Sequence, residues 1–143
     1  MVPKLRQVNI VVRDMEAMAA FYERLGLPMV AGQPEWAADH RSARSDDAPV
    51  VELDSVEFTS WWNQGWGPGN GIVLAFEVPD RAEVDRLYDQ LVAAGARSQQ
   101  SPYDAFWGAR FAVVADPDGN AVAVMSPVDA AYRSALPRPP HER

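Results

Sequence analysis

The sequence offers few side chains of the types that carry chemistry. It contains two histidines, His40 and His141, and no cysteine, which excludes thiolate metal sites, disulfides and cysteine nucleophiles. It has no Gly-x-Ser-x-Gly nucleophile motif, no glycine-rich phosphate loop and no paired-histidine motif. The candidates that remain for acid–base chemistry are His40, Tyr103 and Glu52. Glu52 could act as a base if burial raised its pKa towards neutrality.

Two pairs of polar residues have the spacing that places both members on one face of a strand. Gln7 and Asn9 form the first pair, and Glu52 and Asp54 form the second, because side chains two positions apart in a strand point the same way. If both faces look into one cavity, these side chains would orient a ligand by hydrogen bonds. The two carboxylates would suit a cationic group. The alternative for Glu52 and Asp54 is a solvated strand face.

Five tryptophans in 143 residues are a high content. Trp61, Trp62, Trp66 and Trp107 lie near Gly or Pro, which predicts loops that clamp a planar ligand at the rim of a cavity. Stacking on an indole contributes about 0.5–1.5 kcal/mol beyond area burial, and a cation over the ring about 0.5–2 kcal/mol. At least one of Trp61 and Trp62 is expected to fill a seam instead. Trp36 lies on a predicted strand and is expected either in the hydrophobic core or in the ligand site.

The aromatic segment 103–110 leads directly into a predicted strand. It places Tyr103, Phe106 and Trp107 among the candidate ligand contacts. Arg110, at the start of that strand, is a further candidate, and its alternative is an ion pair with a neighbouring carboxylate.

The elements that must position these residues repeat along the chain. The repeat consists of four residues that recur at constant spacing: Val12, Asp14, Tyr22 and Leu25, then Val78, Asp80, Tyr88 and Leu91. Each copy predicts a strand, a helix with Asp as its N-cap and Gly near its end, and further strands. Two such βαβββ modules, side by side, would form a cup-shaped, pseudo-symmetric curved sheet of the α+β class.

The expected boundaries follow from turn residues and hydrophobic periodicity. The first module covers residues 1–63, a linker 64–71, the second module 72–126 and a tail 127–143, all in one domain. The predicted strands are 5–12, 29–32, 36–45, 50–54, 72–78, 96–100, 110–115 and 121–125. Helices are predicted at 14–25 and 80–94, with a short one at 129–135, and the whole stretch 55–70 is interpreted as irregular.

Composition excludes several classes of protein. At 48% hydrophobic residues the chain is too apolar for disorder, and no apolar run approaches the roughly 20 residues that cross a bilayer. A net charge of −7, with its 13 Lys and Arg scattered, disfavours a nucleic-acid partner. The first residues lack the pattern of a signal peptide, so a cytoplasmic location without membrane attachment is expected.

Three motifs resemble those of the vicinal oxygen chelate superfamily, which contains glyoxalase I, extradiol dioxygenases and bleomycin-resistance proteins. They are Val-Arg-Asp-Met-Glu, Phe-Tyr-Glu-Arg-Leu-Gly-Leu and, before the last strand, Asp-Pro-Asp-Gly-Asn. The resemblance covers nearly the whole chain. It implies paired βαβββ modules and a ligand site inside the cup. It also implies a homodimer, which would protect an exposed sheet edge.

The resemblance also implies four inward-facing metal-ligand positions. They fall here on Gln7, Val73, Ala123 and Glu52, or on Glu57 in place of Glu52 if that strand starts later. Val73 and Ala123 carry no donor atom, so the metal is expected to be lost and no cofactor is expected. The small or apolar residues expected to line the vacated cup are Val11, Val73, Ala75, Ala121, Ala123 and Met125.

The first hypothesis is a metal-independent binding protein, similar to the bleomycin-resistance branch, that sequesters an aromatic natural product, either neutral or cationic, such as an antibiotic. It has no catalytic residues. Its expected ligand contacts are Gln7, Asn9, Trp36, His40, Glu52, Asp54, Trp61, Trp62, Trp66, Val73, Tyr103, Phe106, Trp107, Arg110, Ala123 and Met125. The second hypothesis is a glyoxalase- or dioxygenase-type enzyme with an atypical metal site on Gln7 and Glu52 or Glu57. The third is metal-free catalysis, such as isomerase or lyase chemistry, on a bound ligand.

Overall fold

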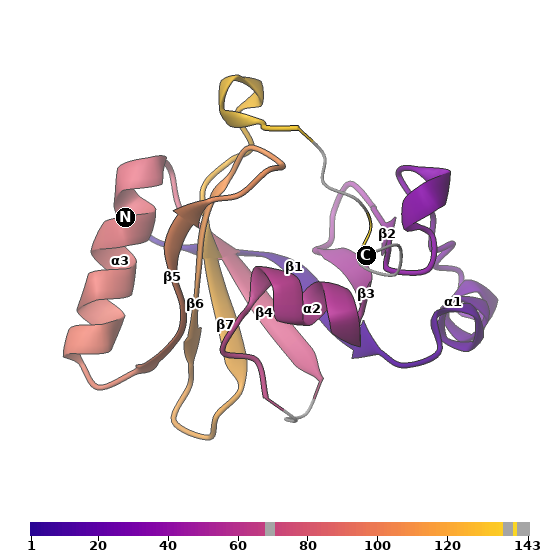
Figure 1. The fold of residues 1–143 in the computed structure, drawn as a ribbon, viewed down its shortest axis with the longest axis horizontal. Coiled ribbons are helices and arrows are strands. Elements are labelled where there is room, and N and C mark those ends of the chain that lie inside the picture. Colours follow the sequence, from indigo (N-terminus) through magenta and orange to yellow (C-terminus); the bar gives the residue numbers. More distant parts are fainter. Residues whose placement is uncertain (68–70, 136–138, 140–143) are drawn as a thin grey trace.

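One curved sheet of seven strands organises the described part of the chain, in the order β2-β3-β1-β4-β7-β6-β5 (Figure 1). The computed structural model describes residues 1–67, 71–135 and 139. The elements, in chain order, are β1 (Lys4–Val12), α1 (Met15–Arg24), η1 (Pro34–Trp36), β2 (His40–Ala43), β3 (Val50–Ser55), α2 (Val56–Trp62), β4 (Ile72–Glu77), α3 (Arg81–Ala93), β5 (Arg97–Asp104), β6 (Arg110–Ala115), β7 (Ala121–Met125) and η2 (Ala130–Tyr132). Among the described residues, no helix has the length and apolar character needed to cross a membrane.

The predicted repeat is confirmed in the pairing of the strands. β1 runs parallel to β3 in the first half, and β4 runs parallel to β7 in the second. Asp14 accepts a hydrogen bond from the Ala17 amide, and Asp80 accepts one from the Glu83 amide, so both helices begin with the same cap. The two halves meet where β1 pairs antiparallel with β4, within a single chain.

The first half is less regular than predicted. The strand expected at 29–32 is reduced to a single bridge between Val30 and Ser42. The strand expected at 36–45 is shortened to β2, and the 3-10 helix η1, which begins at Pro34, precedes it. Trp36 is therefore buried at the end of η1, and its assignment to a strand was wrong.

Helix α2 is the largest departure from the sequence prediction, which placed an irregular segment at 55–70. Its N-cap is Ser55, whose hydroxyl accepts from the Phe58 amide at 3.0 Å. The β-branched and aromatic residues of α2 have weak helix propensity, and burial of Phe58 and Trp62 stabilises the helix instead. Residues 68–70 of that segment lie outside the described residues.

The two faces of the sheet have different covers. On the outer face, α1 packs on β1 and β3, and α3 packs on β6 and β7. On the concave face, α2 lies in front of β1 and β4 (Figure 1). The rings of Phe58 and Trp62 pack against the small side chains of Val73, Ala75 and Ala123. These small residues were expected to leave room for a ligand, but aromatic rings of the chain itself occupy much of that space.

The second half follows the prediction closely. Strands β6 and β7 have the predicted bounds, whereas β5 continues to Asp104, so Tyr103 lies on a strand and not in a loop. The predicted helix at 129–135 is shortened to η2. Most of the remaining tail, 136–138 and 140–143 with His141, lies outside the described residues.

Candidate functional site

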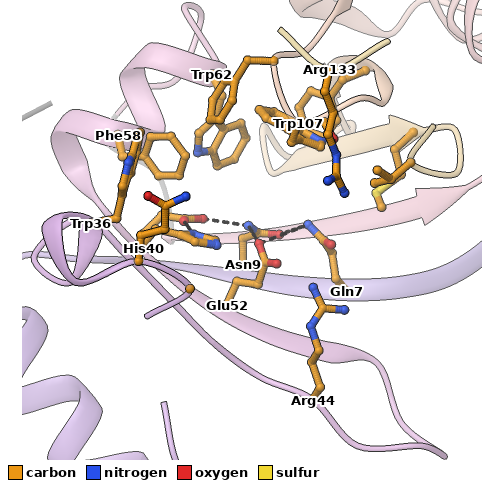
Figure 2. A pocket seen from close by; sticks show the side chains of 17 residues that line it. Gln7, Asn9, Trp36, His40, Arg44, Glu52, Phe58, Trp62, Trp107 and Arg133 are labelled. Carbon is orange, nitrogen blue, oxygen red and sulfur yellow. Dashed lines mark hydrogen bonds and ion pairs between the residues drawn. The ribbon is translucent and has the colours of Figure 1, made fainter. Parts of the chain in front are cut away.

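A pocket of about 350 Å³ opens on the concave side of the sheet (Figure 2). Polar side chains of β1, β2 and β3 form its floor, aromatic rings form its wall, and residues after β2 and β7 form its rim. The residues that line it are Gln7, Asn9, Gly32, Gln33, Trp36, His40, Arg44, Glu52, Asp54, Phe58, Trp62, Phe106, Trp107, Phe111, Met125, Val128 and Arg133.

A connected set of hydrogen bonds holds the floor. The pairing of β1 with β3 places Asn9 opposite Glu52. The side-chain amide of Asn9 donates to Oε2 of Glu52 at 3.0 Å and to Oδ2 of Asp54 at 2.7 Å. The amide of Gln7 donates to Oδ1 of Asn9 at 3.0 Å and to Oε2 of Glu52 at 3.4 Å. Both carboxylates are thus bonded by side chains of the neighbouring strand.

His40 completes the floor from the edge strand β2. Its Nδ1 lies 2.5 Å from Oδ1 of Asp54, a side chain with no exposed surface. Burial opposes a charge on His40, but the charge and hydrogen bond of Asp54, aided by Glu52, outweigh it and raise the pKa of His40 to about 9. His40 is therefore an imidazolium at neutral pH. Burial also raises the pKa of Glu52, although the charge of His40 opposes that rise.

An aromatic wall faces the floor, made of Trp36, Phe58, Trp62, Phe106, Trp107 and Phe111. Trp36 stacks on Phe106 with centroids 6.0 Å apart, which joins η1 to the segment before β6. Trp107 packs edge-on against Phe106 at 5.3 Å and Phe111 at 5.4 Å. The wall therefore draws rings from both halves of the chain.

A tight turn fixes the position of Trp107. The Gly108 amide donates to the Ala105 carbonyl at 2.9 Å, and Gly108 has φ of +104°, a conformation that favours glycine. A Cβ at Gly108 would lie 2.6 Å from the carbonyl oxygen of Asp129. Nε of Arg133 donates to the Trp107 carbonyl at 3.3 Å. The segment after β7 is thereby tied to the turn and brings Arg133 to the rim.

Ten of the predicted contacts gather at this pocket, namely Gln7, Asn9, Trp36, His40, Glu52, Asp54, Trp62, Phe106, Trp107 and Met125. The other six lie elsewhere. Trp61 and Tyr103 line a second hollow of about 330 Å³, which also contacts Trp62, Phe106 and Trp107. Val73 and Ala123 are buried in the core, and Trp66 lines neither hollow. Arg110 pairs with Asp85 and Asp104, which was the alternative considered for it.

Sequence reasoning missed four prominent lining residues, Phe58, Phe111, Arg44 and Arg133. Phe58 was missed together with α2, although Ser55 is a recognisable N-cap signal. Alternation along β6 could have identified Phe111, because neighbouring side chains in a strand point to opposite faces. Phe111 faces the aromatic wall, whereas Arg110 points the other way. Arg44 fell within the strand predicted at 36–45, but β2 ends at Ala43, one residue before it, and Arg133 follows η2, where no strand periodicity indicates a direction.

A family model described as the Glyoxalase/Bleomycin resistance protein/Dioxygenase superfamily matches residues 4–124. The chain belongs to this superfamily. It is similar to the uncharacterized protein YraH of Bacillus subtilis (strain 168), with 29% identity over 129 residues that cover 85% of this chain and 96% of that protein.

Solved structures share the fold at low sequence identity. A Mn(II)-bound glyoxalase from Novosphingobium aromaticivorans gives a TM-score of 0.61 at 23% identity, with 96% of this chain and 44% of that chain covered. A superfamily member from Vibrio splendidus 12B01 gives a TM-score of 0.57 at 13% identity and covers 87% and 99%. These likenesses support the α+β fold with its curved sheet.

The metal-ligand positions implied by the superfamily resemblance do not fit a metal here. Val73 and Ala123 have no donor atoms and lie in the core with about 1% of their surfaces exposed. Glu57, the alternative to Glu52, is an exposed residue in the first turn of α2 and does not line the pocket. Gln7 and Glu52 remain, which is an insufficient donor set for a first-row metal.

A different group of potential donors gathers beside these positions. Atoms of His40, Glu52 and Asp54 lie within 4.8 Å of one another. These atoms already bind each other or Asn9, and metal binding requires a neutral imidazole, which the raised pKa of His40 opposes. Within the part of the chain that the structure describes, a metal at this group would compete with the hydrogen bonds of the floor.

We expect His40 to make the stability of the protein depend on pH. Its folded-state pKa of about 9 exceeds the ordinary value of 6.5, so protonated His40 stabilises the fold below pH 6.5, and this stabilisation is lost as the pH rises through 9. Between these pH values the free energy of unfolding should fall by on the order of 2–3 kcal/mol more in the wild type than in His40→Gln. Urea unfolding across this range measures the difference. If the free energy of unfolding fell equally with pH in the two proteins, the raised pKa of His40 would be contradicted.

Proposed function

We propose that this chain is a binding protein that holds an aromatic small molecule in the pocket of Figure 2 and acts by sequestering it, without a metal and without altering it. The observation that carries the proposal is the pairing of an aromatic wall with a floor whose carboxylates are already bonded. The proposal retains the cytoplasmic location expected from the sequence.

The wall supplies the binding free energy in this proposal. Trp107 is half-buried, so one part of its ring packs in the wall while another part remains open to a ligand. A planar ring against this indole would gain about 0.5–1.5 kcal/mol beyond the burial of apolar surface. A volume of about 350 Å³ suits a molecule of two or three fused rings, or the aromatic part of a larger natural product.

The floor supplies orientation more than reactivity. Asn9 is bonded to both carboxylates and His40 to Asp54, so moving Asn9 or Asp54 would break more than one hydrogen bond. Such a network is rigid, which favours binding in one orientation. Sequestration of an antibiotic or similar natural product, as in the bleomycin-resistance branch, is the biological role that we propose for this binding.

A second candidate function is metal-free proton transfer. It is favoured by one observation, that the imidazolium of His40 and the carboxyl group of Glu52 meet in the same pocket. The imidazolium can donate a proton, and Glu52 in its ionised form can accept one, as isomerisation beside a carbonyl group requires. A ligand recovered from D₂O with deuterium on the carbon beside its carbonyl would favour this function over sequestration.

We also propose that the protein is a homodimer. Leu5, Ile72 and Leu74 of β1 and β4 are more than one-third exposed, and register places Ile72 and Leu74 on the face between α1 and α3. Such an apolar strip favours contact with a second copy.

Sedimentation of the wild type should give twice the chain mass. Leu74→Lys places a charge in the strip and should shift the measured mass towards that of a monomer, whereas Val92→Lys on α3 should not. A monomeric wild type would contradict the dimer.

Trp107 and Trp66 provide a matched test of the binding site. Both are half-buried tryptophans, but Trp66 lies outside the pocket. For an aromatic antibiotic that binds the wild type, Trp107→Ala should weaken affinity roughly three- to tenfold, because one stacking surface is lost. Trp66→Ala should leave the affinity unchanged. Calorimetric titration measures both effects, and equal affinities in the wild type and Trp107→Ala would contradict the proposed site.

A further inference from the structure

The charges that line the pocket define the ligand more narrowly than its aromatic wall does. On the basis of the proposed function, we infer that the bound molecule carries an anionic group, such as a carboxylate, beside its aromatic rings, and that Arg44 and Arg133 bind this group. The inference rests on which of the charged side chains in the pocket already have partners.

The two carboxylates of the pocket accept hydrogen bonds inside the floor, Asp54 through both oxygens and Glu52 through Oε2. Asp54 is fully buried and bonded by His40 and Asn9. Glu52 accepts from Asn9 and Gln7. The expectation of a cationic ligand rested on Glu52 and Asp54 as well as on the tryptophans, and these bonds weaken the part that rested on the carboxylates. Because burial favours protonation of Glu52, its repulsion of a nearby anion is weakened.

The two rim arginines, unlike Asp54, have no ion-pair partner of opposite charge among the described residues. Within residues 1–67 and 71–135, neither Arg44 nor Arg133 forms an ion pair with a carboxylate, in contrast to Arg41, Arg81 and Arg110. Arg133 uses Nε to bind the Trp107 carbonyl, which orients its guanidinium group. Figure 2 shows the guanidinium groups of both rim arginines pointing into the pocket from opposite sides of Gln7.

This placement creates a local positive charge in an acidic protein. The charged residues that line the pocket are His40, Arg44 and Arg133 against Glu52 and Asp54, whereas the whole chain has a net charge of −7. The net charge of the chain does not favour anions, so an anion would be attracted by the local charge of the two exposed rim arginines. The planar fork of a guanidinium group matches the two oxygens of a carboxylate.

The geometry also places the anion relative to the rings. Both arginines lie on the side of the pocket away from Trp36 and Phe58, and Arg133 is adjacent to Trp107 (Figure 2). A ligand whose rings contact the aromatic wall would extend its acidic group towards Gln7 and the two arginines. The ligand class is thus a planar aromatic acid, or a larger molecule that ends in one.

Three probes with the same naphthalene ring and different charge test the inference: 2-naphthoate, the neutral 2-naphthamide and the cationic 2-naphthylmethylammonium. We expect the protein to bind naphthoate most tightly and the ammonium probe most weakly, as measured by quenching of tryptophan fluorescence. Arg44→Gln and Arg133→Gln should each weaken naphthoate binding roughly tenfold, because each removes a charge-assisted contact. Arg97→Gln on β5, outside the pocket, is the control.

The outcomes separate a failure of the anionic ligand from a failure of the aromatic pocket on which it rests. Naphthamide affinity should stay within about twofold in the arginine variants, which also shows that they are folded. If all three probes bind equally, or if the arginine variants bind naphthoate as the wild type does, the anionic ligand is wrong and the aromatic pocket stands. If no probe binds, the aromatic pocket itself is contradicted.

Discussion

The pairing of a buried and a half-buried carboxylate with an amide and an imidazolium is the constraint on which this pocket depends. Asn9 bridges Glu52 and Asp54, and His40 binds Asp54 from the neighbouring strand. An unpaired charge at the position of Asp54, which has no exposed surface, would cost several kcal/mol. The parallel register of β1 and β3 is therefore fixed by polar contacts as well as by the outer core, where Val12 and Leu53 pack beneath α1.

This self-pairing sets what the pocket can do. In the pattern implied by the superfamily resemblance, inward-facing donors on four strands converge on a metal, whereas here the second half contributes Val73 and Ala123 to the core. Helix α2 and Phe111 pack their rings into the concave face over these small residues. The polar floor is thus restricted to the first half of the chain, and both halves contribute to the aromatic wall. This division favours recognition of a planar molecule, which would contact the aromatic wall and be oriented by the polar floor.

The fold could be predicted from the sequence because its signals are local and repeated. Asp14 and Asp80 are helix caps in equivalent positions, and alternation along β1 correctly assigned Gln7 and Asn9 to the concave face. The site was predicted only in part, because its remaining residues depend on tertiary packing. Helix α2 forms despite weak propensity, so Phe58 was missed, and the rim arginines are placed by contacts such as that of Arg133 with Trp107.

Native mass spectrometry of the purified protein, after incubation with manganese, nickel or zinc salts, tests the central claim most directly. That claim is that the donors in the pocket bind one another in preference to a metal. The account predicts a spectrum without a stoichiometric metal adduct, identical for the wild type and Glu52→Ala. One metal ion per chain in the wild type, lost in Glu52→Ala, would contradict it and would make this chain a metal-dependent member of its superfamily.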